Sequence, residues 1–250
     1  MSITTVAIVT GASKGLGQAL AQGLLGPNVH LISVARGVDA QLAAKAALTS
    51  CTLQHVQADL SDPASLNTVI QPVIAALPRT ASRYLLINNA GMVTPIGQAP
   101  SLDNLLAINQ AFALNVSSVI ALTALFLQAT QGLDADRRVL NISSGAGRGP
   151  TPGWGVYCAT KAALDMYTQV VQAENHDVRI VALAPGVIDT DMQSTIRGTQ
   201  TSDFPNVDRF VQMHQHGQLA SATTIANAIL TYMNSADFGT TVLDDIRRHF

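Results

Sequence analysis

Short runs of apolar residues alternate along the chain with longer stretches in which apolar residues recur every three to four positions. The apolar runs predict strands near residues 4–10, 29–35, 52–57, 83–88, 137–142, 178–184 and 240–244. The helical periodicity predicts helices near residues 15–25, 38–49, 62–77, 101–131, 154–174 and 221–234. Strands and helices that alternate in this way, joined by right-handed crossovers, form a parallel sheet with helices on both faces. We therefore predict one α/β domain over residues 1–250, a doubly wound seven-stranded Rossmann sheet.

The composition agrees with a covered parallel sheet, because 48% of the residues are hydrophobic and only 12% are charged. Polar residues interrupt the longest predicted helix, which we interpret as a buried helix and not as a membrane span. The net charge is −2 and the basic residues are dispersed, so we expect no nucleic-acid partner. The first residues resemble no signal segment, and we expect a soluble cytoplasmic protein with no membrane partner.

Residues 190–220 depart from the alternation of strands and helices. A connection of this length inside a compact domain is often a lid or a binding loop. Polar residues crowd its first half, and apolar residues such as Phe204 and Phe210 follow in its second half. The segment is interpreted as a substrate loop; a pair of surface helices without a function is the alternative.

A glycine-rich motif follows the first predicted strand and opens the first predicted helix. It reads Thr10-Gly11-Ala12-Ser13-Lys14-Gly15-Leu16-Gly17. Glycines allow a tight turn and close backbone approach, and the N–H groups at the helix start favour an anionic phosphate. Strand, glycine turn and helix in this order indicate a dinucleotide site, whereas a plain strand-to-helix turn is the simpler alternative.

Tyr157 and Lys161 lie one helical turn apart, so their side chains project from one face of a helix. A phenol with an ordinary pKa near 10 is a poor acid at neutral pH, and a neighbouring ammonium is expected to lower that pKa. Ser144, thirteen residues before the tyrosine, offers a hydroxyl that could hold a substrate oxygen. Its neighbour Ser143 is the alternative for this role.

Together these motifs resemble the short-chain dehydrogenase/reductase family, and the resemblance runs nearly end to end. Further landmarks of the family occur in the expected order: Asn88-Asn89-Ala90-Gly91, Asn115, Asn141-Ile142-Ser143-Ser144 and Pro185-Gly186-Val187-Ile188-Asp189-Thr190. The stretches around Gly153-Trp154 and Asp189-Thr190-Asp191-Met192 resemble the sepiapterin reductase and benzil reductase branch. The Asp208-Arg209-Phe210 stretch and the Asp245-Ile246-Arg247 ending look closest to the benzil reductases.

The resemblance implies the strand order 3-2-1-4-5-6-7 and a nicotinamide cofactor at the carboxyl ends of the strands. It places Asp59 and Leu60 at the adenine, and Val187 and Thr190 at the nicotinamide carboxamide. The residues assigned to the cofactor by the glycine motif and the resemblance are Gly11, Ser13, Lys14, Gly15, Leu16, Gly17, Arg36, Asp59, Leu60, Asn88, Ala90, Gly91, Tyr157, Lys161, Pro185, Gly186, Val187 and Thr190.

Arg36 stands after the second predicted strand, where NAD-selective members of the family carry an acid for the ribose 2′-hydroxyl. Arg36 and Lys14 instead offer two cations for a 2′-phosphate. The cofactor is therefore expected to be NADP, although either cation alone could be a solvated surface charge.

In the mechanism that the resemblance implies, Tyr157 donates a proton to a carbonyl oxygen as hydride arrives from the nicotinamide. Lys161 bonds the nicotinamide ribose, Ser144 holds the substrate oxygen, and Asn115 anchors a water that links Lys161 to solvent. No metal is expected, since His214 and His216, the closest histidines, face different directions on a helix. The alternative to a carbonyl reductase is a catalytically silent NADPH-binding sensor or scaffold on the same fold.

A small carbonyl compound is the expected substrate, and both pterins and aromatic α-diketones are compatible. Trp154, Met192 and the apolar part of 204–213 suggest a pocket for a bulky substrate. Asp245 matches the position at which sepiapterin reductases anchor the pterin, but it could also be a surface acid, solvated or paired with Arg247 or Arg248. The family's usual helix contacts imply a homodimer, with a tetramer as the alternative.

Overall fold

The computed structural model describes residues 3–250. Within these residues, seven parallel strands form one sheet in the order β3-β2-β1-β4-β5-β6-β7, as the resemblance implied. The strands are β1 (Thr5–Thr10), β2 (Val29–Ala35), β3 (Thr52–Gln57), β4 (Arg83–Asn88), β5 (Asp136–Ile142), β6 (Arg179–Ala184) and β7 (Leu243–Asp245). The order reverses between β1 and β4, so the carboxyl ends of these strands diverge there and leave room for a ligand.

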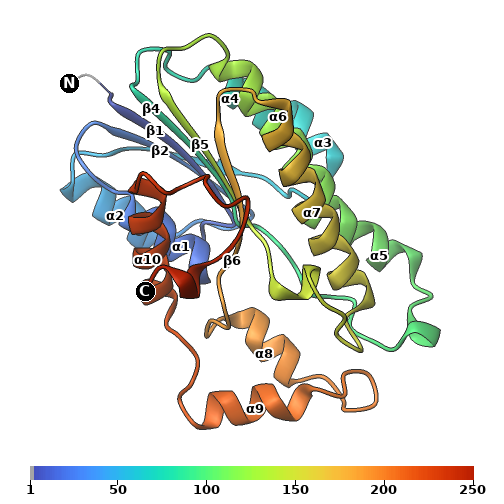
Figure 1. Cartoon of the computed structure of the whole chain (residues 1–250). Coiled ribbons are helices and arrows are strands. Elements are labelled where there is room, and N and C mark those ends of the chain that lie inside the picture. Colours follow the sequence, from blue (N-terminus) through green and yellow to red (C-terminus); the bar gives the residue numbers. More distant parts are fainter. Residues whose placement is uncertain (1–2) are drawn as a thin grey trace.

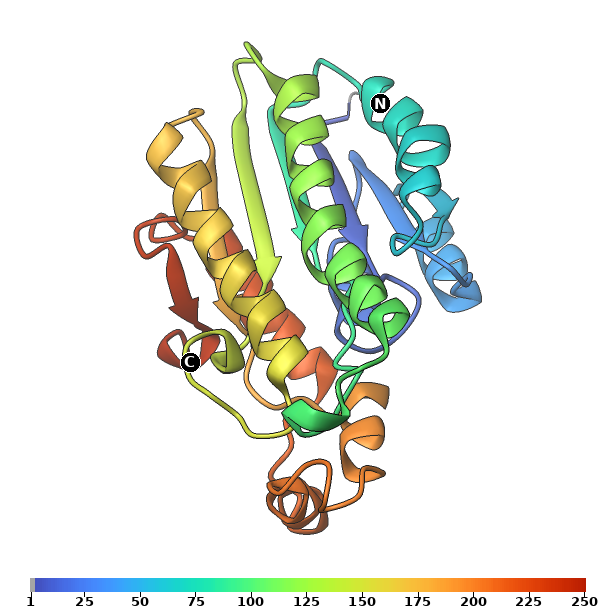
Figure 2. The same cartoon turned by 90° about the vertical axis from the view of Figure 1, so that its right-hand side faces the viewer.

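Helices cover both faces of the sheet (Figures 1 and 2). One face carries α1 (Gly15–Gly23), α2 (Ala40–Leu48) and α10 (Ala222–Asn234). The other carries α3 (Pro63–Ser65), α4 (Gln71–Ala75), α5 (Leu105–Phe112), α6 (Ser118–Thr130) and α7 (Gly155–Glu174). Two more helices, α8 (Asp191–Arg197) and α9 (Val207–Gln215), extend beyond the carboxyl ends of the strands. The chain is therefore a three-layer sandwich with one added segment.

Several helices begin where a short polar side chain caps the first turn. The Asp39 carboxylate accepts a hydrogen bond from the Gln41 N–H, and Ser221 Oγ accepts one from the Thr224 N–H at 3.0 Å. Such a cap satisfies a backbone donor that the helix itself leaves unpaired and contributes about 1 kcal/mol. These two caps lie where α2 and α10 start, within two residues of the predicted positions.

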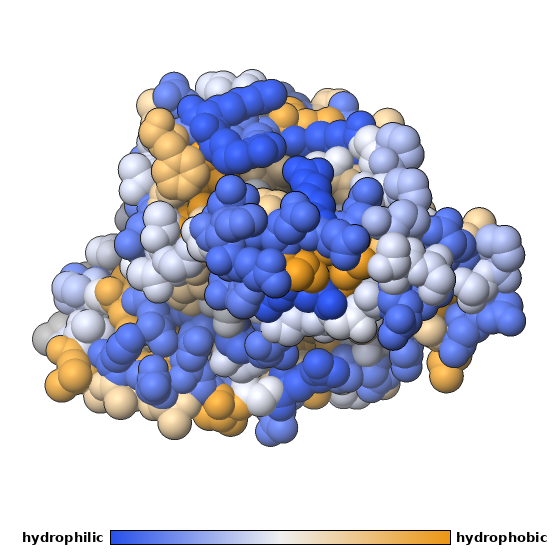
Figure 3. Space-filling view, turned by 90° about the horizontal axis from the view of Figure 1, so that it is seen from below, coloured by the Kyte–Doolittle hydropathy of each residue, from blue (hydrophilic) through white to orange (hydrophobic). Residues whose placement is uncertain are grey.

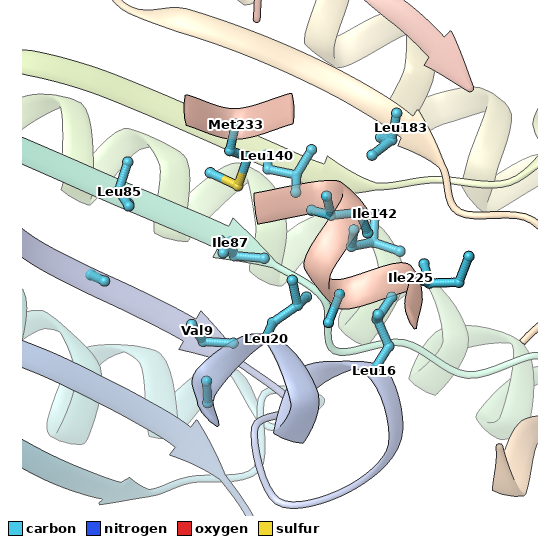
Figure 4. Close-up of a cluster of buried hydrophobic side chains, with 14 of the residues drawn as sticks. Val9, Leu16, Leu20, Leu85, Ile87, Leu140, Ile142, Leu183, Ile225 and Met233 are labelled. Carbon is cyan, nitrogen blue, oxygen red and sulfur yellow. The ribbon is translucent and has the colours of Figure 1, made fainter. Parts of the chain in front are cut away.

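The core between the sheet and the helices α1 and α10 is aliphatic. Figure 4 shows Val9 of β1 and Leu140 of β5 facing Leu20 of α1 and Met233 of α10. All four side chains are buried. Burying an aliphatic side chain of this size contributes about 1.5–3 kcal/mol, so this layer fixes α1 and its preceding glycine turn on the sheet.

Two predicted elements begin at least three residues later in the structure than predicted. The long helix predicted at 101–131 begins at Leu105, because Asn104 caps it, and it contains a π-helical turn, η3 (Ala113–Ser117). The last strand begins at Leu243 and not near residue 240, because Phe238 turns inward and packs on Tyr232 with 5.3 Å between ring centroids. Gly239 then turns the chain at a φ of +91°, which glycine adopts readily.

Candidate active site

A cavity of about 690 Å³ opens at the carboxyl ends of the strands. Its walls come from the turns after β1, β2, β3, β4, β5 and β6, from α7, from α8 and α9, and from the end of β7. Seen from below, the surrounding surface is mostly hydrophilic, with small apolar areas between the polar side chains (Figure 3). A volume of this size suits a small-molecule ligand.

The glycine loop, residues 10–17, forms one end of this cavity. Gly11 has a φ of +67°, and a Cβ placed on Gly17 would lie 2.2 Å from the Gly11 carbonyl oxygen. Asn89 fixes the loop from the neighbouring strand, since its Nδ2 donates to the Thr10 carbonyl at 2.9 Å. The first turn of α1 therefore presents its unpaired backbone N–H groups to the cavity, where an anionic phosphate is favoured.

Lys14 and Arg36 both line the cavity and both face a carboxylate. Lys14 Nζ lies 2.7 Å from Asp191 Oδ2 at the start of α8, and Arg36 lies 4.0 Å from Asp59 Oδ2. All four side chains are largely exposed, so these pairs contribute little to stability. The two cations stay accessible to a phosphate group.

Tyr157 and Lys161 lie in the opposite wall, on the first turns of α7. Lys161 Nζ lies 5.8 Å from the centre of the Tyr157 ring and donates a hydrogen bond of 2.8 Å to the Ile142 carbonyl. Both side chains are buried and both line the cavity. The helical spacing thus brings the phenol and the ammonium to the same site, as predicted.

The expectation that Lys161 lowers the pKa of Tyr157 is wrong for this structure. Burial raises the pKa of the phenol to about 12, and a hydrogen bond with Ser144 lowers it only in part. The Lys161 ammonium is engaged by the Ile142 carbonyl, and burial lowers its own pKa to about 8. The phenol therefore keeps its proton at neutral pH, which is the form that a proton donor needs.

The structure distinguishes the two serines at the end of β5. Ser144 lines the cavity, and its Oγ accepts a hydrogen bond from the Ala146 N–H at 3.2 Å. Ser143 also borders the cavity, but its hydroxyl is engaged and donates to the buried Asp165 Oδ1 at 2.5 Å. Ser144 is thus the hydroxyl that lies beside Tyr157, and Ser143 is held in a buried network.

Asn115 lies in the π-helical turn η3 and not in the cavity wall. Its Nδ2 donates to the Met92 carbonyl at 2.8 Å and to Thr160 Oγ1 at 3.1 Å, while its Oδ1 accepts the Met92 N–H at 2.9 Å. Asn115 therefore joins the turn after β4 to the residue that precedes Lys161. The role in a water relay stays a prediction.

Asn88 requires a correction among the residues predicted to contact the cofactor. Its side chain is buried at the end of β4 and donates to Asn141 Oδ1 at 2.8 Å, so it ties two strands together and lies outside the cavity wall. The next residue, Asn89, lines the cavity and holds the glycine loop. Because side chains alternate along a strand end, a shift of one residue decides which asparagine faces the ligand.

The cavity wall also contains aromatic and charged side chains. Trp154 stacks on Phe204 with 4.7 Å between ring centroids and meets Tyr157 edge-on at 5.5 Å. Asp245, at the end of β7, accepts hydrogen bonds from Arg247 Nε at 2.8 Å and from Arg247 Nη2 at 2.5 Å. These bonds lower the pKa of the Asp245 carboxyl below its usual range, so Asp245 and Arg247 are an ion pair in the cavity wall.

Most predicted site residues share this cavity although they come from distant parts of the sequence. Those lining it are Gly11, Ser13, Lys14, Gly15, Leu16, Gly17, Arg36, Asp59, Leu60, Ala90, Gly91, Ser144, Trp154, Tyr157, Lys161, Pro185, Gly186, Val187, Thr190, Met192 and Asp245. Sequence reasoning did not assign Asn89, Arg209 and Arg247 to the site, although all three lie in motifs that it quoted. Residues 190–220 line the cavity through α8 and α9, which argues against a surface helix pair without a function.

A glycine turn at a helix start and a buried Tyr–Lys pair in one cavity of a Rossmann sheet are typical of nicotinamide-dependent oxidoreductases. A family model described as short chain dehydrogenase matches residues 5–201. The chain belongs to the short-chain dehydrogenase/reductase family, whose members use nicotinamide cofactors.

Two relatives belong to the branch that the sequence resembles. A benzil reductase ((S)-benzoin forming) of Bacillus cereus is 38% identical over 236 residues, which cover 92% of this chain and 94% of the relative. A sepiapterin reductase of Rattus norvegicus is 35% identical over 246 residues, which cover 93% of this chain and 92% of the relative. The crystal structure of the KRED1-Pglu enzyme matches with a TM-score of 0.81 at 27% identity, covering 94% of this chain and 98% of that chain.

Proposed function

We propose that this oxidoreductase uses NADPH to reduce ketones and α-diketones, with Tyr157 as the proton donor. One observation carries the proposal: Tyr157, Lys161 and Ser144 line the same cavity as the glycine loop. A ligand held by its phosphates at the loop can therefore reach the phenol with its other end. The relatives named benzil reductase and sepiapterin reductase support a carbonyl substrate.

The residues fit a bound dinucleotide. The close approach of Gly17 to Gly11 leaves no room for side chains in the turn that would receive the phosphates. Bound NADPH supplies the hydride. Ser144 then holds the carbonyl oxygen beside Tyr157, which donates its proton, and Lys161 would hold the nicotinamide ribose.

The preference for NADPH over NADH rests on Lys14 and Arg36. Both cations line the cavity, and the carboxylates that face them, Asp191 and Asp59, are exposed and can be exchanged for a phosphate at little cost. The 2′-phosphate of NADPH would form charge-assisted hydrogen bonds with an arginine side chain. The 2′-hydroxyl of NADH carries no charge and would form only weaker hydrogen bonds there.

The pair of Asp245 and Arg247 favours an α-diketone over a pterin. A carboxylate in the wall suits the N–H donors of a pterin, but both oxygens of Asp245 already accept hydrogen bonds from Arg247. A neutralised ion pair in the same cavity wall as the ring of Trp154 suits a substrate without such donors. Benzil is therefore the preferred test substrate, with sepiapterin as the competitor.

The loss of NADPH absorbance tests this function with the purified protein. We expect turnover with benzil in the presence of NADPH and at least tenfold lower kcat/KM with NADH, since one charge-assisted contact contributes about 1.5–3 kcal/mol. A protein that binds NADPH but reduces no ketone or diketone would be the silent sensor or scaffold, and the proposal would then be wrong.

We further propose a homodimer formed through α5, α6 and α7. α5 and α6 continue each other through η3, and this long helix lies beside α7 on the outer face of the molecule (Figure 2). Together they expose apolar side chains: Leu105, Leu106, Phe112, Ile120, Met166 and Val170. An apolar face on neighbouring helices is typical of a protein interface. Sedimentation equilibrium distinguishes a dimer from a monomer or a tetramer.

A further inference from the structure

A buried carboxylate lies directly behind the reacting groups. Asp165 stands one helical turn after Lys161 on α7, and only 5% of its side chain is exposed. Its Oδ1 accepts the Ser143 hydroxyl at 2.5 Å, and its Oδ2 accepts Arg148 Nε at 3.0 Å. The roles assigned so far to Tyr157 and Ser144 do not use this carboxylate.

Arg148 connects this carboxylate to two strands. Its Nη1 donates to the Asp244 carbonyl of β7 at 2.9 Å, and its Nη2 donates to the Ala182 carbonyl of β6 at 3.0 Å. The planar guanidinium thus binds one helix and two strand ends at once, which a lysine cannot do. Its position is therefore strongly defined.

The loop between Ser144 and Arg148 rests on the backbone of Lys161. A Cβ placed on Gly147 would lie 2.7 Å from the Lys161 carbonyl carbon and 2.9 Å from its oxygen. Ser144 at one end of this loop faces the cavity, and Arg148 at the other end is anchored by Asp165. A shift of the ion pair would therefore move Ser144 relative to the helix that carries Tyr157 and Lys161.

Charges alternate through this part of the molecule. The Asp165 carboxylate raises the pKa of Lys161 and opposes the lowering by burial, while Arg148 lowers the pKa of Asp245 in the cavity wall. The charged and titratable groups around Lys161 are Tyr157 and Asp165 on its own helix and, from the loop after β5, Arg148; Cys158 adjoins the tyrosine.

We propose that Asp165 and Arg148 are positioning residues for the reduction. The ion pair of Asp165 and Arg148 holds the Ser144 loop against α7. The Asp165 carboxylate favours the ammonium form of Lys161, and the Arg148 cation weakens this electrostatic attraction. This inference rests on the proposed function in assigning Lys161 and Ser144 a part in the reaction.

The titration of Lys161 tests the electrostatic half of the proposal without any substrate. Lys14, Lys45 and Lys161 are the only lysines in the sequence, so the Cε signals of a protein labelled with ¹³C-lysine can be assigned by single substitutions. In the unmodified protein the Lys161 signal should titrate near pH 8. In Asp165→Asn the midpoint should fall by roughly one pH unit, because an attractive charge is lost.

Arg148→Gln should move the same midpoint in the opposite direction. With its cation gone, the Asp165 carboxylate acts on Lys161 without compensation, so the ammonium persists to higher pH. Opposite shifts in two variants cannot arise from loosened packing, which would move both midpoints in the same direction. This second variant also keeps the proposal testable if Asp165→Asn does not fold.

Asp136 provides the matched control at the amino ends of the strands. It pairs with Arg138 at 2.9 Å and with Arg179 at 2.7 Å, far from the cavity wall. Asp136→Asn should lower the melting temperature and leave the Lys161 midpoint unchanged. The proposal is overturned if the Lys161 midpoint shifts equally in this control and in Asp165→Asn. It is also overturned if the midpoint shifts neither in Asp165→Asn nor in Arg148→Gln.

Kinetics with benzil and NADPH complete the test. The pH above which kcat declines should move with the Lys161 midpoint in each variant, while KM for benzil stays within about twofold. If the Lys161 midpoint shifts in the variants but the dependence of kcat on pH does not, the positioning role is overturned. If the lysine signals shift as expected but the unmodified protein reduces no ketone, the proposed function fails and the influence of Asp165 on Lys161 is supported.

Discussion

The glycine-loop end of the cavity is built from backbone, whereas the opposite end is built from side chains of three distant segments. Residues 10–17 form their site within one strand-turn-helix unit, and the buried core between β1 and α1 holds it in place. The other end combines Trp154 of the turn before α7 with Phe210 of α9 and Asp245 of β7. A site built from backbone groups tolerates few substitutions. A wall built from side chains can come to prefer another ligand when one or two of its residues are substituted.

The largest of the three effects that probe this comparison is expected at the glycine loop. In Gly17→Ala the new Cβ would lie 2.2 Å from the Gly11 carbonyl oxygen, so the turn must open. Overpacking of this kind costs about 1–3 kcal/mol, and NADPH affinity should fall roughly 10- to 100-fold. Fluorescence titration with NADPH measures the change.

Gly149→Ala is the matched control for this variant. Among residues 3–250, no atom lies within 4 Å of a Cβ placed there, and Gly149 lies outside the cavity wall. NADPH affinity should therefore be unchanged. An equal loss in both variants would mean that the loop is not the phosphate site.

A smaller and more selective effect is expected at Arg36. Arg36→Asp places a second carboxylate beside Asp59 and should weaken NADPH at least tenfold relative to NADH, since charge-assisted bonds contribute about 1.5–3 kcal/mol. The ratio of the two dissociation constants is the measurement. If that ratio does not change, Arg36 takes no part in cofactor selection.

The smallest effect is expected at the side-chain wall. Arg247→Ala frees the Asp245 carboxylate and should raise the ratio of sepiapterin to benzil kcat/KM by about two- to fivefold, the range of a partly exposed ion pair. Adding Asp245→Asn should abolish that gain. A gain that survives the second substitution would show that Asp245 does not discriminate between the two substrates.

The same contrast explains how far the sequence could be interpreted. Apolar runs and glycine spacing are local signals, so the approximate bounds of the strands, the glycine loop and the Tyr157–Lys161 pair could be predicted, whereas the strand order in the sheet came from the family resemblance. Asn88 and Asn89 could not be separated, because the direction of a side chain at a strand end depends on neighbouring strands. Arg148 and Asp165 carry no spacing signal, since their contact depends on how the loop after β5 folds onto α7.

The direction of the pKa shift of Tyr157 could not be predicted from the sequence either. The spacing to Lys161 is correct, but the sign of the shift depends on burial and on the Ile142 carbonyl, which holds the ammonium. Both are properties of the folded chain.

The most direct test of the account is the turnover of Tyr157→Phe at saturating NADPH and benzil. The variant loses only the phenolic hydroxyl, so NADPH affinity should be nearly intact while kcat falls by roughly 10²-fold or more, the scale of acid catalysis. The titration with NADPH and the melting temperature serve as controls for folding. Near-normal turnover in a folded variant that binds NADPH would contradict the assignment of Tyr157 as the proton donor.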